Sequence, residues 1–147
     1  MADLPAPWGT RMATLDEIGD YLEDYGAGVQ GVDLFLGSRP EGPDNCLTVY
    51  EYPGGPPEYI QDSFAPVAER VQIQVVARSG GYEEAHRRAS VAWAALAVVT
   101  NATLGSTKYR SIRPNSSPAL MGRDPNDRIL VFFNATVEKE VSLAESS

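Results

Sequence analysis

A chain of 147 residues that is 43% hydrophobic and 22% charged has the length and composition of one globular domain, which excludes wholesale disorder. Its formal net charge of −8, from 20 acidic and 12 basic residues, argues against a protein that wraps the nucleic-acid backbone, since that binding depends on Lys and Arg. Its single cysteine, Cys46, excludes an intramolecular disulfide and a cysteine-based zinc site.

Targeting signals are not evident in the sequence. The N-terminus lacks a basic segment followed by an apolar run, and no stretch approaches the ~18 apolar residues of a membrane span. We therefore expect an intracellular protein with no membrane partner.

The first third of the chain predicts an arm followed by a helix. Residues 1–13 are rich in proline, with Trp8 as a large apolar anchor, and residues 142–147 form a short C-terminal tail; a single domain is expected over 14–141. The helix is predicted to begin at Thr14, which would form a capping box with Glu17, and to end at Gly26. Its apolar residues recur at intervals of three and four and share one face.

Alternating patterns and turn residues predict five strands and a second helix. The helix is expected from Tyr82 to Val99, with small alanines facing a sheet and Trp93 as the bulky anchor. The expected strands are Val32–Leu36, Cys46–Tyr52, Arg70–Arg78, Lys108–Arg113 and Arg128–Glu140. These elements predict an α/β (α+β) fold in which two helices pack on a mainly antiparallel sheet with long loops.

Two loops and one strand bear on contacts with other molecules. Residues 53–66 hold four prolines and two glycines and predict a loop, and residues 101–107 predict another. The first contains Tyr59, Ile60 and Phe64, which would pack either on the domain or on a neighbouring subunit. The last strand is apolar on both faces in its first half. One face would pack on the helices, and a second subunit would cover the other.

The motifs that resemble catalytic or binding sites fail on context. Gly26 to Gly31 has the spacing of a dinucleotide fingerprint, but a helix precedes it and a strand follows, the reverse of what that site needs. His86 is the only histidine, so the second half of a di-metal helix pair is missing. A catalytic triad is not predicted either, because no G-x-S-x-G elbow is present to expose a serine. The residues from Asp124 to Asp127 resemble the start of a calcium loop but lack its later ligands, so they predict a turn. No catalytic residue, cofactor or metal is predicted, and the protein is not expected to be an enzyme.

Short segments in a fixed order carry a resemblance to a known family. The chain from Leu15 to Glu140 resembles the phage minor capsid or tail terminator (tail-completion) proteins. The segments that carry it are Leu15-Asp16-Glu17-Ile18, Tyr21-Leu22, Leu34-Phe35-Leu36-Gly37, Pro43-Asp44-Asn45-Cys46, Tyr50-Glu51-Tyr52, Gly54-Gly55-Pro56-Pro57, Val71-Gln72-Ile73-Gln74-Val75, Tyr109 with Ile112, Ser117-Pro118 and Gly122-Arg123-Asp124. The N-terminal arm and the segment from Glu58 to Glu69 depart from the pattern.

The resemblance implies a structural virion protein at the head-tail junction, assembled in the host cytoplasm. Such a protein caps the tail tube as a ring, usually of six subunits, and contacts the tube protein on one side and the head connector or stopper on the other. A head-completion or stopper protein is the alternative, and a small-molecule-binding domain is a remote one.

Two sets of residues are the candidates for these contacts. The interface candidates are Trp8, Tyr59, Ile60, Phe64, Leu120, Met121 and Arg123. The candidates for an acidic bore, through which DNA would pass without specific binding, are Asp16, Glu17, Asp20, Glu23 and Asp24. A solvated outer helix face accounts for the same acidic pattern.

Overall fold

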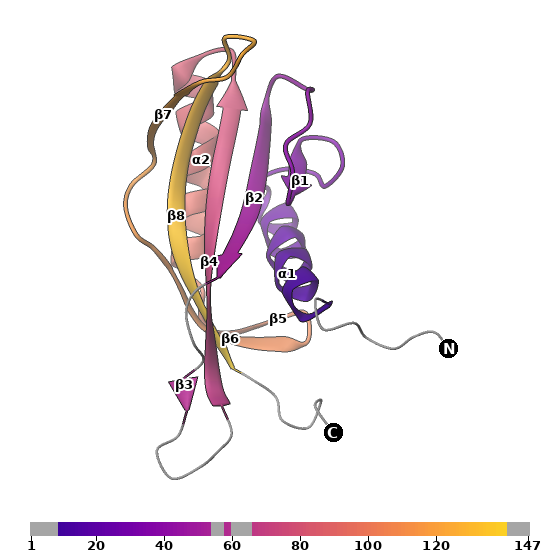
Figure 1. Ribbon diagram of the computed structural model, residues 1–147, viewed down its shortest axis with the longest axis vertical. Helices are drawn as coiled ribbons and strands as arrows, with labels where there is room; N and C mark the ends of the chain where they lie inside the picture. Colours follow the sequence, from indigo (N-terminus) through magenta and orange to yellow (C-terminus); the bar gives the residue numbers. More distant parts are fainter. Residues whose placement is uncertain (1–8, 54–57, 60–65, 141–147) are drawn as a thin grey trace, which may run out of the picture.

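One curled sheet with both helices on the same face makes up the domain (Figure 1). The computed structural model describes residues 9–53, 58–59 and 66–140, and the side chains of 14–52 and 68–140. Within these ranges no helix is long and apolar enough to cross a membrane. The elements are α1 (Gly9–Tyr25), β1 (Leu34–Leu36), β2 (Cys46–Pro53), β3 (Glu58–Tyr59), β4 (Pro66–Ser79), α2 (Tyr82–Ala97), β5 (Thr100–Leu104), β6 (Thr107–Pro114), β7 (Ala119–Arg123) and β8 (Ile129–Glu140).

The strand order places β1 and β7 at opposite edges of the sheet. The order is β1-β2-β4-β8-β6-β5, with β3 added on β4 and β7 added on β8. Strand β6 pairs with residues 135–139 of β8 and β7 with residues 129–132, so the two lie end to end along the same edge of β8. All pairs are antiparallel except β1 with β2. The predicted fold class and the five predicted strands are confirmed.

Three short strands add to the five that the sequence predicted. Strand β3 occupies two residues of the proline-rich segment predicted as a loop, and β7 follows Ser117-Pro118, where no element was predicted. Strand β5 replaces the loop expected at residues 101–107 and joins β6 through a turn at Gly105. Its residues are exposed or half-buried and Asn101 has a positive φ of 50°, so the alternation that marks a buried strand is missing.

The capping box predicted at the start of α1 is wrong. The helix begins at Gly9, inside the segment predicted as an arm, so Thr14 and Glu17 lie within it. The Thr14 hydroxyl instead contacts the ammonium of buried Lys139, and the Glu17 carboxylate bonds the β5–β6 hairpin. Both side chains therefore fasten α1 to the far end of the sheet. The predicted stop is confirmed, because Gly26 has φ +101° and its N–H bonds the Leu22 carbonyl at 3.1 Å.

The core lies between the helices and one face of the sheet. The alternating residues of β4 and β8 predicted to face inward are all buried, and Ala85, Ala89 and Ala92 let α2 approach them closely. Helix α2 ends at Ala97, two residues earlier than predicted. Tyr82 has the helical spacing of the buried alanines but is exposed. Trp93 is partly buried against the core and donates a hydrogen bond to the Ser116 carbonyl at 2.9 Å.

The helix-free face of the sheet is partly covered within the subunit. At one end the loop between β1 and β2 lies over buried Arg78, whose guanidinium donates to the Pro43 carbonyl at 2.7 Å. Leu130 on the outer face of β8 is buried in the single chain, whereas Phe132 is half-buried. Only the part of β8 around Phe132 therefore keeps the uncovered apolar surface that the sequence predicted.

Candidate interaction surfaces

The predicted interface residues divide into those that the structure describes and those that it does not. Trp8, Ile60 and Phe64 lie outside the described residues. Tyr59 belongs to β3, where its backbone pairs with Pro66 of β4. The other three predicted residues all lie on β7.

Strand β7 presents two neighbouring apolar side chains to solvent. Its pairing with β8 shifts between Leu120 and Gly122, which have Val131 and Leu130 as partners, and Gly122 takes a φ of +140°. A bulge of this kind interrupts the alternation of a strand and re-aims its side chains. Leu120 is 57% exposed and Met121 41% exposed, with Arg123 beside them. The bulge thus turns an edge strand into a small apolar surface.

The acidic residues of α1 have different environments. Asp16 and Asp24 are exposed. Asp20 and Glu23 accept hydrogen bonds from the Gln30 amide at 2.7 and 3.1 Å, which ties the turn after α1 back to the helix. Asp20 remains exposed despite this bond, whereas Glu23 is half-buried. Three of the five predicted acids therefore keep their charge at the surface.

Glu17 is the predicted acid that is most deeply engaged in the fold. Its carboxylate accepts hydrogen bonds from the Tyr109 hydroxyl at 2.7 Å, the Thr107 hydroxyl at 3.0 Å and the Ser106 N–H at 3.1 Å. Burial, followed by the hydrogen bond to Glu17, raises the pKa of Tyr109 far above its usual range. Tyr109 is fully buried, so this contact joins α1 to the centre of β6.

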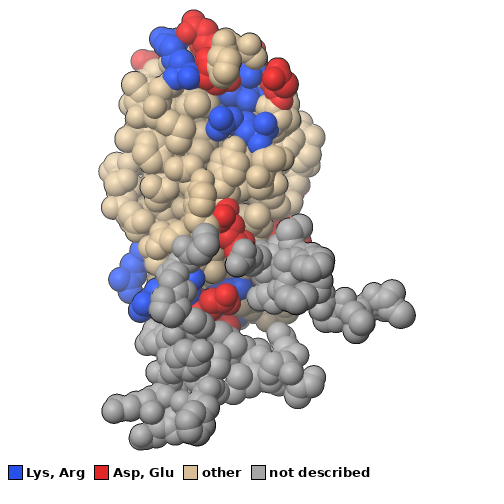
Figure 2. All heavy atoms as spheres, in the orientation of Figure 1, with Lys and Arg blue, Asp and Glu red and all other residues tan. Residues whose placement is uncertain are grey.

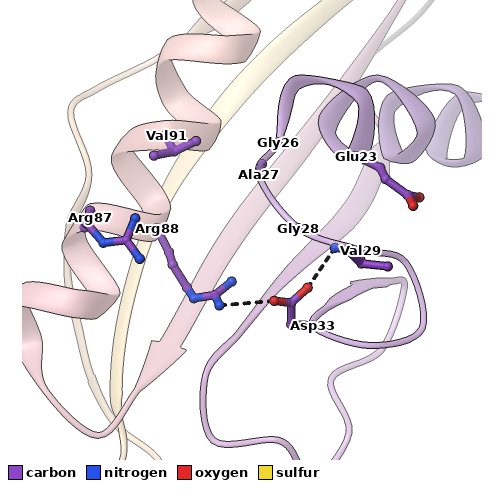
Figure 3. Close-up of a pocket in the computed structure, with 9 residues that line it drawn as sticks. All are labelled: Glu23, Gly26, Ala27, Gly28, Val29, Asp33, Arg87, Arg88 and Val91. Atoms are coloured by element: carbon purple, nitrogen blue, oxygen red, sulfur yellow. Dashed lines mark hydrogen bonds and ion pairs between the residues drawn. The ribbon is translucent and has the colours of Figure 1, made fainter.

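A pocket of about 290 Å³ lies between α2 and the turn that follows α1 (Figure 3). Asp33 crosses it, accepting from the Arg88 guanidinium at 3.1 Å and from the Val29 N–H at 2.7 Å. Arg87 pairs with Glu84 at 2.7 Å, and this hydrogen bond lowers the pKa of the Glu84 carboxyl. Both arginines at the pocket are thus paired with carboxylates of the same chain. Asp33 holds the turn against α2.

A second charged cluster pins the β1–β2 loop to the β7–β8 turn. Arg128 is buried and bonds Asp124 at 2.8 Å, Asp44 at 3.1 Å and the Glu41 carbonyl. Burial raises the pKa of the Asp124 carboxyl, but hydrogen bonds from the backbone and guanidinium of Arg128 outweigh that effect, so its pKa lies below the usual range. Asp124 Oδ1 also accepts the N–H of Asn126, which confirms the predicted turn.

The middle of the helix-free sheet face carries no charge. Figure 2 shows a wide area without Lys, Arg, Asp or Glu, with charged side chains gathered toward the two ends. The register places polar residues across β2, β4 and β8 here, among them the row Tyr50, Gln74 and Asn134. Tyr52 and Gln74 are in hydrogen-bond contact at 3.4 Å.

One exposed apolar surface was not predicted from the sequence. Tyr25, Val29 and Val32 lie at the end of α1 and in the turn after it, and they are 48%, 48% and 61% exposed. Glycines separate these three residues, so they show neither helical nor strand periodicity. Only their apolar character, next to a predicted helix end, could have indicated the surface. Within the described part of the chain, no group of three or more His, Cys, Asp or Glu side chains is placed to hold a metal ion.

Comparison with known families shows which class of protein this chain belongs to. The family model described as "Bacteriophage tail terminator protein" matches residues 21–141, which is well over half of the chain. The chain belongs to the bacteriophage tail terminator family. It is a structural component of a virion and not an enzyme. The match covers all the elements from the last five residues of α1 to the end of β8.

Solved structures share the fold at low sequence identity. A chain from the "Virion of native gene transfer agent (GTA) particle" aligns with a TM-score of 0.54 and 14% identity, covering 76% of this chain and 81% of that one. A second solved structure aligns with a TM-score of 0.55 and 13% identity, covering 90% of this chain and 94% of that one. No curated protein matches the chain.

Proposed function

We propose that the protein closes the end of the tail tube as an oligomeric ring of six subunits and joins the tail to the head connector. The family match over residues 21–141 carries this proposal. One face of the ring would contact the tube protein and the other the connector or stopper protein. The protein would assemble in the host cytoplasm and act at the head-tail junction of the particle.

The charge of the ring suits a channel for DNA. At −8 per chain, six copies carry 6 × −8 = −48, and a negative wall repels the phosphate backbone so that DNA slides without binding. We assign the bore-facing role to Asp16 and Asp20, two of the three exposed acids of the predicted set. The third, Asp24, lies next to the last residue of α1, beside the exposed Tyr25. Glu17 and Glu23 are only half-exposed and bond partners within the subunit.

The bore assignment has its own test. Asp16→Asn combined with Asp20→Asn is expected to leave tail length unchanged and to slow or impair DNA ejection, because the wall then repels the phosphate backbone less strongly. Glu83→Gln with Glu140→Gln, two exposed acids elsewhere, gives a matched loss of charge. Equal ejection by all three particles would remove the bore role from α1.

The capping role is tested with purified tail tubes that lack this protein. Added protein should bind one end of each tube, stop further addition of tube subunits and make the tubes competent to join filled heads. Binding to heads but not to tubes would transfer the assignment to a stopper protein of the connector. Binding to neither would contradict both roles.

A further inference from the structure

Two exposed apolar surfaces lie at opposite edges of the sheet. The turn surface (Tyr25, Val29 and Val32) lies at the β1 edge, and the bulge surface (Leu120 and Met121) lies on β7 at the other edge. Figure 1 shows α1 and β1 on one side of the sheet and β7 on the other. Five of the eight large hydrophobic side chains exposed in the described residues belong to these two surfaces. They are therefore concentrated where neighbouring copies in a ring would meet.

The two chain segments that hold these surfaces carry charges of opposite sign. Residues 14–36, which hold the turn surface, contain six acidic residues and no basic one: Asp16, Glu17, Asp20, Glu23, Asp24 and Asp33. Residues 100–123, which hold the bulge surface, contain four basic residues and no acidic one: Lys108, Arg110, Arg113 and Arg123. Two copies of a chain with a net charge of −8 repel one another in most orientations. Glu17 and Asp33 are paired within the subunit. Asp24 next to the turn surface and Arg123 next to the bulge surface are exposed, so contact between the two surfaces sets an acid against a base.

We infer that the turn surface of one copy packs against the bulge surface of the next copy. Contact between two different surfaces of the same chain is heterologous, and it closes into a ring when the rotation between copies fits. The occupant of each surface is thus a second copy of this chain. The inference rests on the proposed ring and adds to it the residues through which the subunits join.

The local structure prepares both surfaces for this contact. Asp33 holds the turn through Arg88 and the Val29 N–H, so the turn is ordered before a partner arrives. Among the described residues β7 pairs only with β8, which leaves its outer edge open to a neighbour. Arg123 pairs with Asp127 at 3.2 Å, but Asp127 is 83% exposed, and such a surface pair is weak enough to exchange for Asp24 of the next copy.

Cross-linking tests the contact directly. Val32→Cys and Leu120→Cys are introduced together in the full chain, and a short bis-maleimide is added to the purified protein and to tails that contain it. Cys46 is fully buried and serves as an internal control for access. A ladder of cross-linked subunits up to ring size is expected. The pair Val98→Cys with Leu120→Cys, equally exposed but away from the turn, should give no ladder.

Mixing two defective variants tests the polarity of the contact. Val32→Asp removes the turn surface and Leu120→Asp the bulge surface, so neither variant alone should form rings. An equimolar mixture has one intact turn and one intact bulge for each pair, so it should stop at mixed dimers in native mass spectrometry. Arg123→Asp should raise the protein concentration needed for assembly about tenfold, and Asp24→Arg in the same chain should restore it.

The outcomes separate this contact from the proposed function. Particles with capped tails of normal length but no ladder would overturn the contact and leave the terminator role standing. Cross-links from both cysteines to a different virion protein would also overturn it, since a second copy would not be the occupant. Failure of the wild-type chain to cap tubes would instead contradict the proposed function.

Discussion

Replacing Glu17 by alanine should destabilise the isolated subunit, because this carboxylate joins α1 to the β5–β6 hairpin. It accepts three hydrogen bonds, from Tyr109, Thr107 and Ser106. The substitution removes all three at once. It also leaves the hydroxyl of fully buried Tyr109 without its carboxylate acceptor in the core.

The expected cost follows from how accessible each donor is. Thr107 is half-buried and Ser106 exposed, so water can replace their bonds, and the loss is about 0.5–1 kcal/mol each. The Tyr109 hydroxyl is buried, so water cannot readily replace the carboxylate, and with only Thr14 left as a partner the loss costs about 1–3 kcal/mol. The sum is about 3 kcal/mol. For a chain of this size, that corresponds to a fall of about 9 °C in the midpoint of thermal unfolding.

Thermal and urea unfolding followed by circular dichroism measure this effect. Asp16→Ala is the matched control, since Asp16 is an exposed acid one residue away on the same helix, and its effect should stay within about 0.5 kcal/mol. Equal stabilities of the two variants would refute the argument that Glu17 holds the hairpin. They would return Glu17 to the set of residues available to line a bore.

Three further predictions concern the hairpin, the charged turn and the subunit contact. Gly105→Ala should cost about 2 kcal/mol in the free energy of unfolding, because Gly105 has φ +62° and a Cβ there would lie 2.7 Å from the Glu17 carboxylate. The pKa of Asp124 is lowered in the folded chain, so as the pH falls this carboxyl is protonated first in the unfolded chain. The stability that ionised Asp124 contributes is therefore complete above the ordinary Asp pKa of about 3.9 and is lost at lower pH. Unfolding midpoints measured across this window should depend less on pH in Asp124→Asn, which cannot titrate against Arg128. Arg88→Met should weaken ring assembly in sedimentation velocity, because it frees the turn after α1 without changing the apolar side chains on it.

Each of these has a contrary outcome. If Gly105→Ala has the same free energy of unfolding as the wild type, the hairpin shifts away from Glu17 at little cost. Parallel pH profiles for the wild type and Asp124→Asn would show that the Arg128 pair does not favour the ionised carboxyl. Unchanged assembly of Arg88→Met would mean that the turn is held by other contacts.

Strong periodic patterns made the sheet and α2 predictable, whereas short edge elements were not. The alternation in β4 and β8 marks strands with one buried face, and both were located within a few residues. Strand β5 has no buried face and β3 has two residues, so neither produces a pattern. Their pairing is set by neighbouring strands that are distant in the sequence.

The start of α1 and the role of Glu17 show the limits of local rules. Thr14 followed by Glu17 has the spacing of a capping box, but the same two side chains can bind partners on other elements. Their partners, Lys139 and the hairpin residues around Tyr109, lie about 90 to 125 residues further along the chain. That contact is a property of the fold and has no signature near Thr14.

The two exposed apolar surfaces were predictable only in part. Leu120, Met121 and Arg123 stand out in a polar segment, and the structure places them together on an exposed strand. Their counterpart at Val29 and Val32 was missed, because its meaning depends on lying at the opposite edge of the sheet from β7. Strand order, which short sequence patterns do not encode, makes the two surfaces complementary.

Tail length is the most direct test of the central claim that this protein ends the tail tube. It is measured by electron microscopy in lysates of a phage with a nonsense mutation in this gene, beside the wild type and a complemented mutant. The account predicts overlong tails without heads, restored to normal length by the full chain. Tails of normal length beside unjoined heads would contradict it and identify a connector component instead.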